Sequence, residues 1–213
     1  MKKMKSPSSI KYINIADSTK ELINSVVFSS NKVVRNLKEN YNPYLFIGNA
    51  VHSYIEFIYD KFTINQAKVS ALIDAKLKHP KPNQYPIKLT NNLNDVFEHN
   101  IKFAVNYLNT KVVEAIELRT YWIDKYESIF NKSIGGTADI VIKNNNGTYT
   151  IADFKNYENP NSDDLRKHYT QVLVYANMLA LQNDWTIQDI QIVYCSQEQV
   201  ITLPYEVLDL RTV

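Results

Sequence analysis

The chain has 213 residues, a formal net charge of +2 and 45% hydrophobic residues. These values are typical of a globular domain with one sizeable core, and the weakly basic charge permits a nucleic-acid partner without predicting one. The single cysteine, Cys195, excludes a disulfide within the chain and any zinc or iron–sulfur site that needs four cysteines.

A secretory signal, a membrane span and a nucleotide-binding loop are not expected from the sequence. The N-terminal lysines have no apolar run behind them, and no stretch of about 18 apolar residues occurs. We therefore expect an intracellular, cytoplasmic protein in a reducing compartment, with no membrane partner. The four glycines form neither a GxGxxG nor a GxxxxGK[ST] loop, so a phosphate-cradling nucleotide site is not expected.

Hydrophobic periodicity predicts a helical first half and a strand-rich second half within one α/β domain covering residues 1–213. Helices are expected at residues 48–62, 64–78, 92–108 and 159–184. Strands are expected at residues 111–123, 133–143, 148–155, 190–195 and 199–205. Residues 1–20 are expected to be irregular or weakly extended, and the proline-rich stretch 79–86 to be a loop.

The stretch GGTADIVIKNNNGTYTIADFKNY, residues 135–157, predicts a β-hairpin with acidic residues on one face. A loop of about three residues with Gly147 in the left-handed conformation pairs Asn144 with Thr148. The same register places Asp139 opposite Asp153, at a Cβ separation of about 4.5–5.5 Å where like charges repel. A slip of one residue would leave these side chains facing solvent instead.

Two facing carboxylates indicate a divalent cation. Mg²⁺ and Mn²⁺ prefer oxygen ligands and retain several waters, so two acids and a substrate phosphate suffice to hold them. Lys155 lies two residues after Asp153 and so points to the same face of the strand. A lysine there can orient the attacking water and stabilise charge developing on phosphorus. The pattern thus predicts metal-assisted hydrolysis of a phosphodiester.

These residues resemble the PD-(D/E)XK nuclease superfamily, in particular its RecB-type and mitochondrial genome maintenance exonuclease branches. The hairpin with Asp139 and DFK (153–155) carries the resemblance, together with the following helix that bears Gln171 and Tyr175. Upstream, GNAVHSYIE (48–56) matches the Gly-x3-His helix of that branch, and VVEAIE (112–117) matches its glutamate-bearing strand. The resemblance covers roughly residues 45–195.

The resemblance implies a restriction-endonuclease-like core, with a mixed central sheet flanked by helices and a helical region towards the N-terminus. Residues 1–45 would be an extension, 46–110 the helical region and 111–205 the catalytic core. The implied metal ligands are His52, Asp139, Asp153 and the carbonyl of Phe154. The implied catalytic residues are Asp139, Asp153, Lys155, Gln171 and Tyr175, with Glu117 in a less defined role.

The implied activity is a Mg²⁺- or Mn²⁺-dependent DNA exonuclease of DNA repair or recombination that acts on single strands or free ends. An endonuclease or nickase of the same fold and a non-catalytic nucleic-acid-binding module remain alternatives. The intact set of Asp139, Asp153 and Lys155 disfavours pure binding. Because the sequence has no helicase motif, a helicase or a replication or recombination protein is a further candidate partner.

Several side chains keep two interpretations. Glu56 is either a partner for a nearby cation or a site residue, and Gln171 and Tyr175 either line the site or belong to the core edge. Five lysines of the helix-and-loop region before the hairpin either face solvent or contact substrate phosphates: Lys61, Lys68, Lys76, Lys78 and Lys81. The remaining histidines are expected at the surface: His79, His99 and His168.

Overall fold

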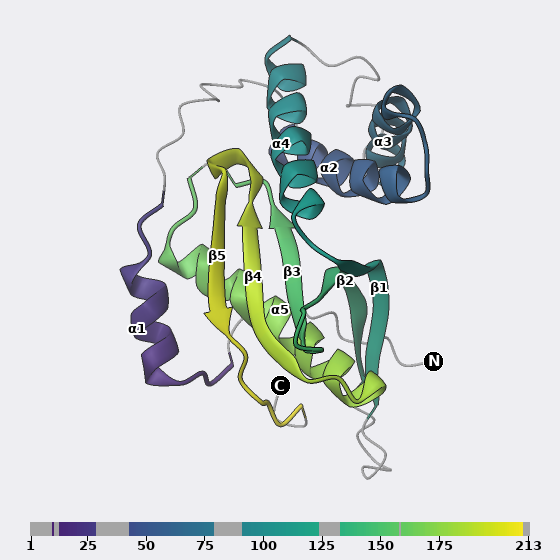
Figure 1. The fold of residues 1–213 in the computed structure, drawn as a ribbon. Helices are drawn as coiled ribbons and strands as arrows, with labels where there is room; N and C mark the ends of the chain where they lie inside the picture. Colours follow the sequence, from purple (N-terminus) through teal and green to yellow (C-terminus); the bar gives the residue numbers. More distant parts are fainter. Residues whose placement is uncertain are drawn as a thin grey trace.

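The structure is a computed structural model that describes residue 10 and residues 13–28, 43–78, 91–123, 133–157 and 159–210. It is a mixed α/β fold in which a five-stranded sheet is flanked by helices (Figure 1). The helices are α1 (Asp17–Ser25), α2 (Pro43–Tyr59), α3 (Ile64–Lys78), α4 (Asn91–Asn109) and α5 (Ser162–Asn183). The strands are β1 (Val113–Ile123), β2 (Ser133–Lys143), β3 (Tyr149–Lys155), β4 (Ile187–Tyr194) and β5 (Gln199–Pro204). The 3₁₀ helix η3 (Cys195–Gln197) joins the last two strands.

The strands follow the order of the chain across the sheet, from β1 to β5. Neighbouring strands are antiparallel except for β3 and β4, which are parallel and are connected through α5. A parallel pair needs a long crossover, and the helix supplies it. The prediction of a mixed sheet flanked by helices, with a helical region preceding it, is confirmed.

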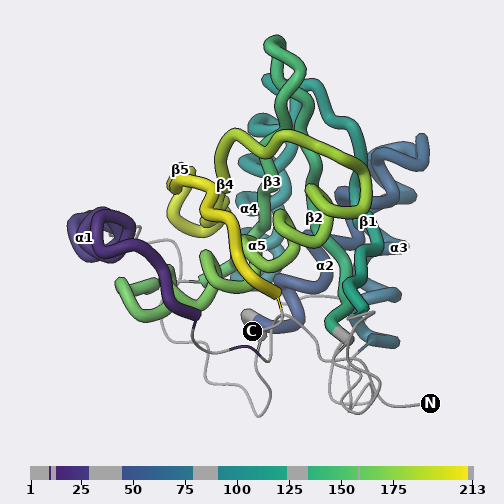
Figure 2. The backbone as a smooth tube through the Cα atoms, turned by 90° about the horizontal axis from the view of Figure 1, so that it is seen from below, coloured from purple at the N-terminus to yellow at the C-terminus, as the bar shows by residue number. Residues whose placement is uncertain are grey.

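Two apolar clusters fill the space between the sheet and its helices. One joins α5 and α1 to the sheet, with Leu165, Val172 and Tyr194 fully buried. The other joins α2, α3 and α4 to strand residues that include Ala152 and Phe154. Figure 2 shows α1 beside β5 at one edge of the sheet and α3 beyond β1 at the other. The sheet is therefore a central layer whose middle strands are covered on both sides.

The β2–β3 hairpin has the register that its turn residues predict. The backbone N–H of Asn144 donates to Thr148 O at 2.8 Å, and Gly147 has a φ of 80°. The pairs Lys143–Tyr149 and Ile140–Ala152 continue the same register. The ladder ends at the Ile140–Ala152 pair, and the predicted juxtaposition of Asp139 and Asp153 lies one residue beyond it.

The N-terminal predictions need two corrections. Residues 17–25 form α1 rather than irregular chain, and the helix packs through Thr19 and Ile23, which are four residues apart. Helix α2 begins at Pro43, since proline suits a first helical turn, and it ends at Tyr59 rather than at residue 62. Lys61 adopts a left-handed φ of 65°, and Phe62 N–H donates back to Phe57 O at 3.0 Å, which closes the helix.

The other elements lie close to their predicted positions. Helix α5 starts after Asn161, whose side chain accepts from Asp164 N–H at 3.0 Å in a capping box. The fourth strand begins earlier than predicted, at Ile187 rather than at residue 190. The proline-rich loop 79–86 lies outside the described residues. Within the described part of the chain, no helix combines the length and the apolar character that crossing a bilayer requires.

Candidate metal and catalytic site

The site begins where the β2–β3 ladder stops. The last paired residues are Ile140 and Ala152, and hydrogen-bonded pairs alternate along the ladder, so Ala138 and Phe154 would form the next one. Instead, Phe154 N–H donates to the Asp139 carboxylate at 3.0 Å. The separation of the two strands thus frees backbone groups in the middle of a sheet and directs them at side chains.

His52 of α2 lies at this separation. Its Nε2 is 3.1 Å from Phe154 O, and its Nδ1 is 3.4 Å from Asp139 Oδ2 and 3.6 Å from Glu117 Oε1. Burial lowers the pKa of His52, but the neighbouring carboxylates outweigh burial and raise that pKa to about 9. At neutral pH an imidazolium therefore fills the gap between two acids and a carbonyl.

Glu117 of β1 and Asp139 of β2 form a row of two acids on adjacent strands. The pairs Ile116–Ile140 and Leu118–Ala138 flank it, so it lies opposite Asp139. Its φ is 50°, a left-handed conformation in the middle of a strand. The other non-glycine residues with positive φ in the described part of the chain all end helices: Lys61, Asp184 and Glu198. Such backbone strain costs on the order of 1–3 kcal/mol and concentrates at functional sites.

Asp153 and Lys155 form a buried ion pair beside this row. Lys155 Nζ is 2.6 Å from Asp153 Oδ2, and the Asp153 side chain is only 3% exposed. Burial and the charge of Asp139 raise the pKa of Asp153 to about 6, although Lys155 opposes the shift. Burial lowers the pKa of Lys155, but the two aspartates outweigh it and the net shift is upward. The lysine is therefore charged at neutral pH.

Three side chains of this site meet the geometric requirement for holding one ion. Ligand atoms of His52, Glu117 and Asp139 lie within 4.8 Å of one another. The Phe154 carbonyl, which contacts His52, adds a further oxygen donor. Carboxylate and carbonyl oxygens with one imidazole are suitable ligands for Mn²⁺ and, apart from the imidazole, for Mg²⁺. The residues present therefore fit a divalent metal.

The geometric cluster differs from the predicted ligand set at two positions. Glu117, which had a less defined role, joins the cluster with His52 and Asp139. Asp153 lies outside that cluster, with its carboxylate directed at Lys155. Sequence reasoning placed both acids near the site, but it could not assign the direction in which each side chain turns.

Helix α5 closes the site from the other side. Lys155 Nζ donates to Gln171 Oε1 at 3.4 Å, so Gln171 contacts the site rather than only the core edge. Tyr175 is buried, and burial raises the pKa of its phenol. The charges of Asp153 and Asp139 also raise that pKa, whereas Gln171 and Lys155 lower it.

Of the histidines expected at the surface, His168 is buried and His99 is partly exposed. His168 is only 7% exposed, and its Nδ1 is 2.8 Å from the Tyr194 hydroxyl. Burial and the charge of Lys155 lower the pKa of His168 to about 3, so its ring is neutral. The side chain of His99 is 23% exposed and lies 3.7 Å from a Glu198 carboxylate oxygen. His79 lies outside the described residues.

Lys78 approaches the site from the end of α3. It pairs with Asp74 at 2.7 Å and donates to Ser53 Oγ at 3.4 Å, next to His52. Lys78 also opposes the upward shift that burial causes in the pKa of Glu56, in keeping with a partner role for Glu56. The Lys78 side chain is still 54% exposed and could contact a bound anion.

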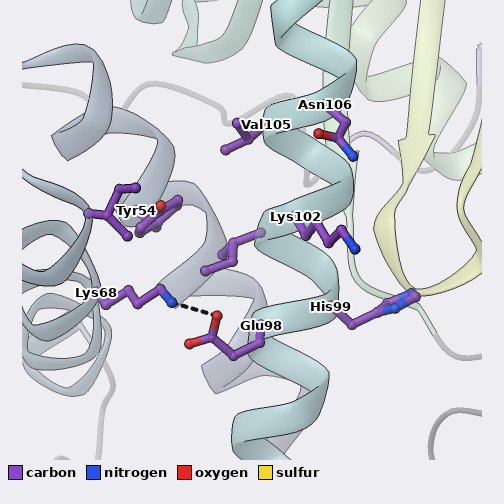
Figure 3. Close-up of a pocket in the computed structure, with 9 residues that line it drawn as sticks. Tyr54, Lys68, Glu98, His99, Lys102, Val105 and Asn106 are labelled. Atoms are coloured by element: carbon purple, nitrogen blue, oxygen red, sulfur yellow. Dashed lines mark hydrogen bonds and ion pairs between the residues drawn. The ribbon is translucent and has the colours of Figure 1, made fainter.

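Lys68 belongs to a different face of the helical region. It pairs with Glu98 at 2.6 Å in a groove of about 500 Å³ between α3 and α4 (Figure 3). Tyr54 also lines that groove and lies two residues after His52, which is about 200° around the helix. Lys68 therefore faces away from the site. Lys61 is exposed, Lys76 is half-buried, and Lys81 lies outside the described residues.

Comparisons with known proteins add little. No model of a protein family matches the chain, and no curated protein matches it. Among solved structures, "Crystal structure of SSO0001" superposes with a TM-score of 0.40 at 17% sequence identity, over 84% of this chain and 73% of that chain. A similarity of this size carries no argument about function.

Proposed function

We propose that the chain is a Mg²⁺- or Mn²⁺-dependent deoxyribonuclease that hydrolyses phosphodiester bonds, acting as an exonuclease on single strands or free ends. The observation that supports this most is the convergence of ligand atoms of Glu117, Asp139 and His52, with charged Lys155 alongside. A cluster built only for stability would not place acids side by side on adjacent strands.

The proposed metal ligands are Glu117, Asp139, the Phe154 carbonyl and His52. A bound Mg²⁺ or Mn²⁺ would polarise a phosphoryl oxygen and supply an acidified water at neutral pH. His52 must release its proton before it can act as a ligand, because only the neutral imidazole has a free lone pair. Once His52 is neutral, the carboxylates of Asp139 and Glu117 no longer pair with it and can bind the cation.

Lys155 is the proposed catalytic cation of this site. Asp153 and Gln171 hold its ammonium group from two sides, which fixes its position without neutralising the whole cluster. A fixed ammonium stabilises the negative charge that develops on a phosphoryl group in the transition state. Because the ammonium is already in position, the site does not have to reorganise during the reaction. Asp153 serves here as the group that orients Lys155.

The test uses end-labelled single-stranded DNA, end-labelled duplex DNA and circular single-stranded DNA, each with EDTA, Mg²⁺ or Mn²⁺. We expect metal-dependent loss of the linear substrates, and loss of that activity in Asp139→Asn. Asp163→Asn is the matched control, since Asp163 is an exposed acid in the first turn of α5. It should cleave at the wild-type rate.

The substrates also separate the rival functions. Cutting of circular DNA would assign an endonuclease or nickase instead of an exonuclease. Binding of DNA without cleavage under any metal would assign a binding module. Metal-independent cleavage that survives Asp139→Asn would refute the proposed site, because the activity would then arise elsewhere or from a contaminant.

A further inference from the structure

The chain that follows Lys155, the last residue of β3, extends the site in one direction. Asp153 and Lys155 share the face of β3 that looks towards α5, and Tyr157 lies two residues past Lys155. Their contacts on α5 run in reverse order: Lys155 meets Gln171 at 3.4 Å, and Tyr157 meets His168 with a centroid separation of 4.6 Å. Tyr157 is therefore the next position outward from the catalytic cation.

Tyr157 is an exposed aromatic ring on a rigid support. It is 44% exposed, whereas the next residue back, Asn156, is 8% exposed and accepts a hydrogen bond from Asn100 at 2.9 Å. His168 meets the Tyr157 ring edge-on, at an interplanar angle of 73°. His168 is itself fixed by the Tyr194 hydroxyl at 2.8 Å.

This support carries no net charge. The imidazole of His168 is neutral, and burial raises the pKa of the Tyr194 phenol, which therefore remains protonated. A neutral, buried pair keeps the Tyr157 ring in place without competing for a phosphate. The exposed part of the ring is thus available to a planar, uncharged group that is attached to that phosphate.

We propose that Tyr157 is a stacking platform for one unpaired nucleobase of the substrate, next to the phosphate held at Lys155. The inference rests on the nuclease function proposed above and makes it more specific, because a base within a duplex is already stacked on its neighbours. The substrate class is therefore single-stranded DNA or a frayed end. Any base can stack on an aromatic ring, so this contact does not select a sequence.

The experiment measures equilibrium binding of single-stranded oligonucleotides in Ca²⁺, with one abasic residue moved along the strand. We expect wild-type affinity to fall at one abasic position by roughly 5- to 150-fold, the usual range for loss of one base–aromatic stack. Tyr157→Ala should lose a similar factor on the intact strand and show no further loss at that position. Tyr157→Phe should keep the wild-type profile. Tyr59→Ala, which removes an aromatic ring that is 47% exposed on α2, should also keep it.

The outcomes separate the inference from the function on which it rests. If wild type cleaves DNA but Tyr157→Ala binds every oligonucleotide as wild type does, the platform is refuted and the nuclease proposal stands. If Tyr157→Phe loses as much affinity as Tyr157→Ala, the hydroxyl rather than the ring makes the contact, and stacking is again refuted. If wild type neither binds nor cleaves any DNA, both proposals fail.

Discussion

Asp153→Asn should make the metal-free protein more stable while abolishing cleavage. The Asp153 carboxylate is almost fully buried, and its pKa rises from 3.8 to about 6 despite the ion pair with Lys155. A rise of that size corresponds to about 3 kcal/mol of unfavourable free energy when the folded protein holds this group ionised. Asparagine has nearly the same shape and carries no charge, so the variant escapes this cost.

The sign of the pH dependence follows from linkage. A carboxyl whose pKa is higher in the folded state binds its proton more tightly there, so wild type loses stability as pH rises from 3.8 through about 6. The variant lacks this loss. We therefore expect the stability difference in favour of Asp153→Asn to grow by about 2 kcal/mol between pH 4 and pH 7.5, as measured by urea unfolding in EDTA.

Two results would contradict this reasoning. A stability difference that stays constant over the pH range would mean that Asp153 titrates alike in the folded and unfolded chains. A variant that becomes relatively less stable as pH rises would mean that the pair with Lys155 outweighs burial. Adding Mn²⁺ provides an internal check, because metal that binds only the folded protein should stabilise wild type by RT ln(1 + [Mn²⁺]/Kd).

Three further predictions concern the same region. Lys155→Arg and Lys155→Ala should both lose most cleavage activity while still binding DNA, because a planar guanidinium cannot replace a compact ammonium. Near-normal turnover by the arginine variant would show that Lys155 contributes only its charge. Metal affinity should rise about tenfold per pH unit between pH 7 and pH 9, because His52 has a pKa of about 9 and binds metal only when neutral. Calorimetry in buffers of different ionisation enthalpy should detect about one proton released on metal binding. A pH-independent affinity would show that His52 is not a ligand. Neutralising Lys76, Lys78 and Lys81 together should weaken binding of single-stranded DNA and reduce the slope of log affinity against log salt concentration by up to about 2. Single-turnover cleavage at saturating DNA should change little. An unchanged affinity and slope would show that these lysines only face solvent.

The hairpin could be predicted from sequence because its determinants are local. Asn144 to Gly147 set the turn, and a turn of known length fixes which residues face each other for the rest of the ladder. The prediction that Asp139 faces Asp153 depends only on counting from that turn. Lys155 follows by strand alternation, so three site residues were available from one short stretch.

Other features depend on contacts between distant segments. His168 has no sequence signal for burial, and only the packing of α5 against β4 brings it to the Tyr194 hydroxyl. The left-handed conformation of Glu117 has no sequence signal either, because glutamate is not a residue that favours this conformation. The direction of the Asp153 carboxylate is set by Lys155 and by burial, which alternation along a strand does not specify.

The crossover from β3 through α5 to β4 also bears on how the protein folds. Pairing β3 with the parallel strand β4 closes a long loop that contains α5. The conformational entropy of that loop is lost before any hydrogen bond between the two strands can form. The charged cluster does not depend on that closure, because its acids and Lys155 lie on β1, β2 and β3 and His52 lies on α2. During synthesis, α2 leaves the ribosome before these strands do. We therefore expect His52 to titrate as an ordinary histidine until the three strands have formed, because Asp139, Glu117 and Asp153 are the groups that raise its pKa.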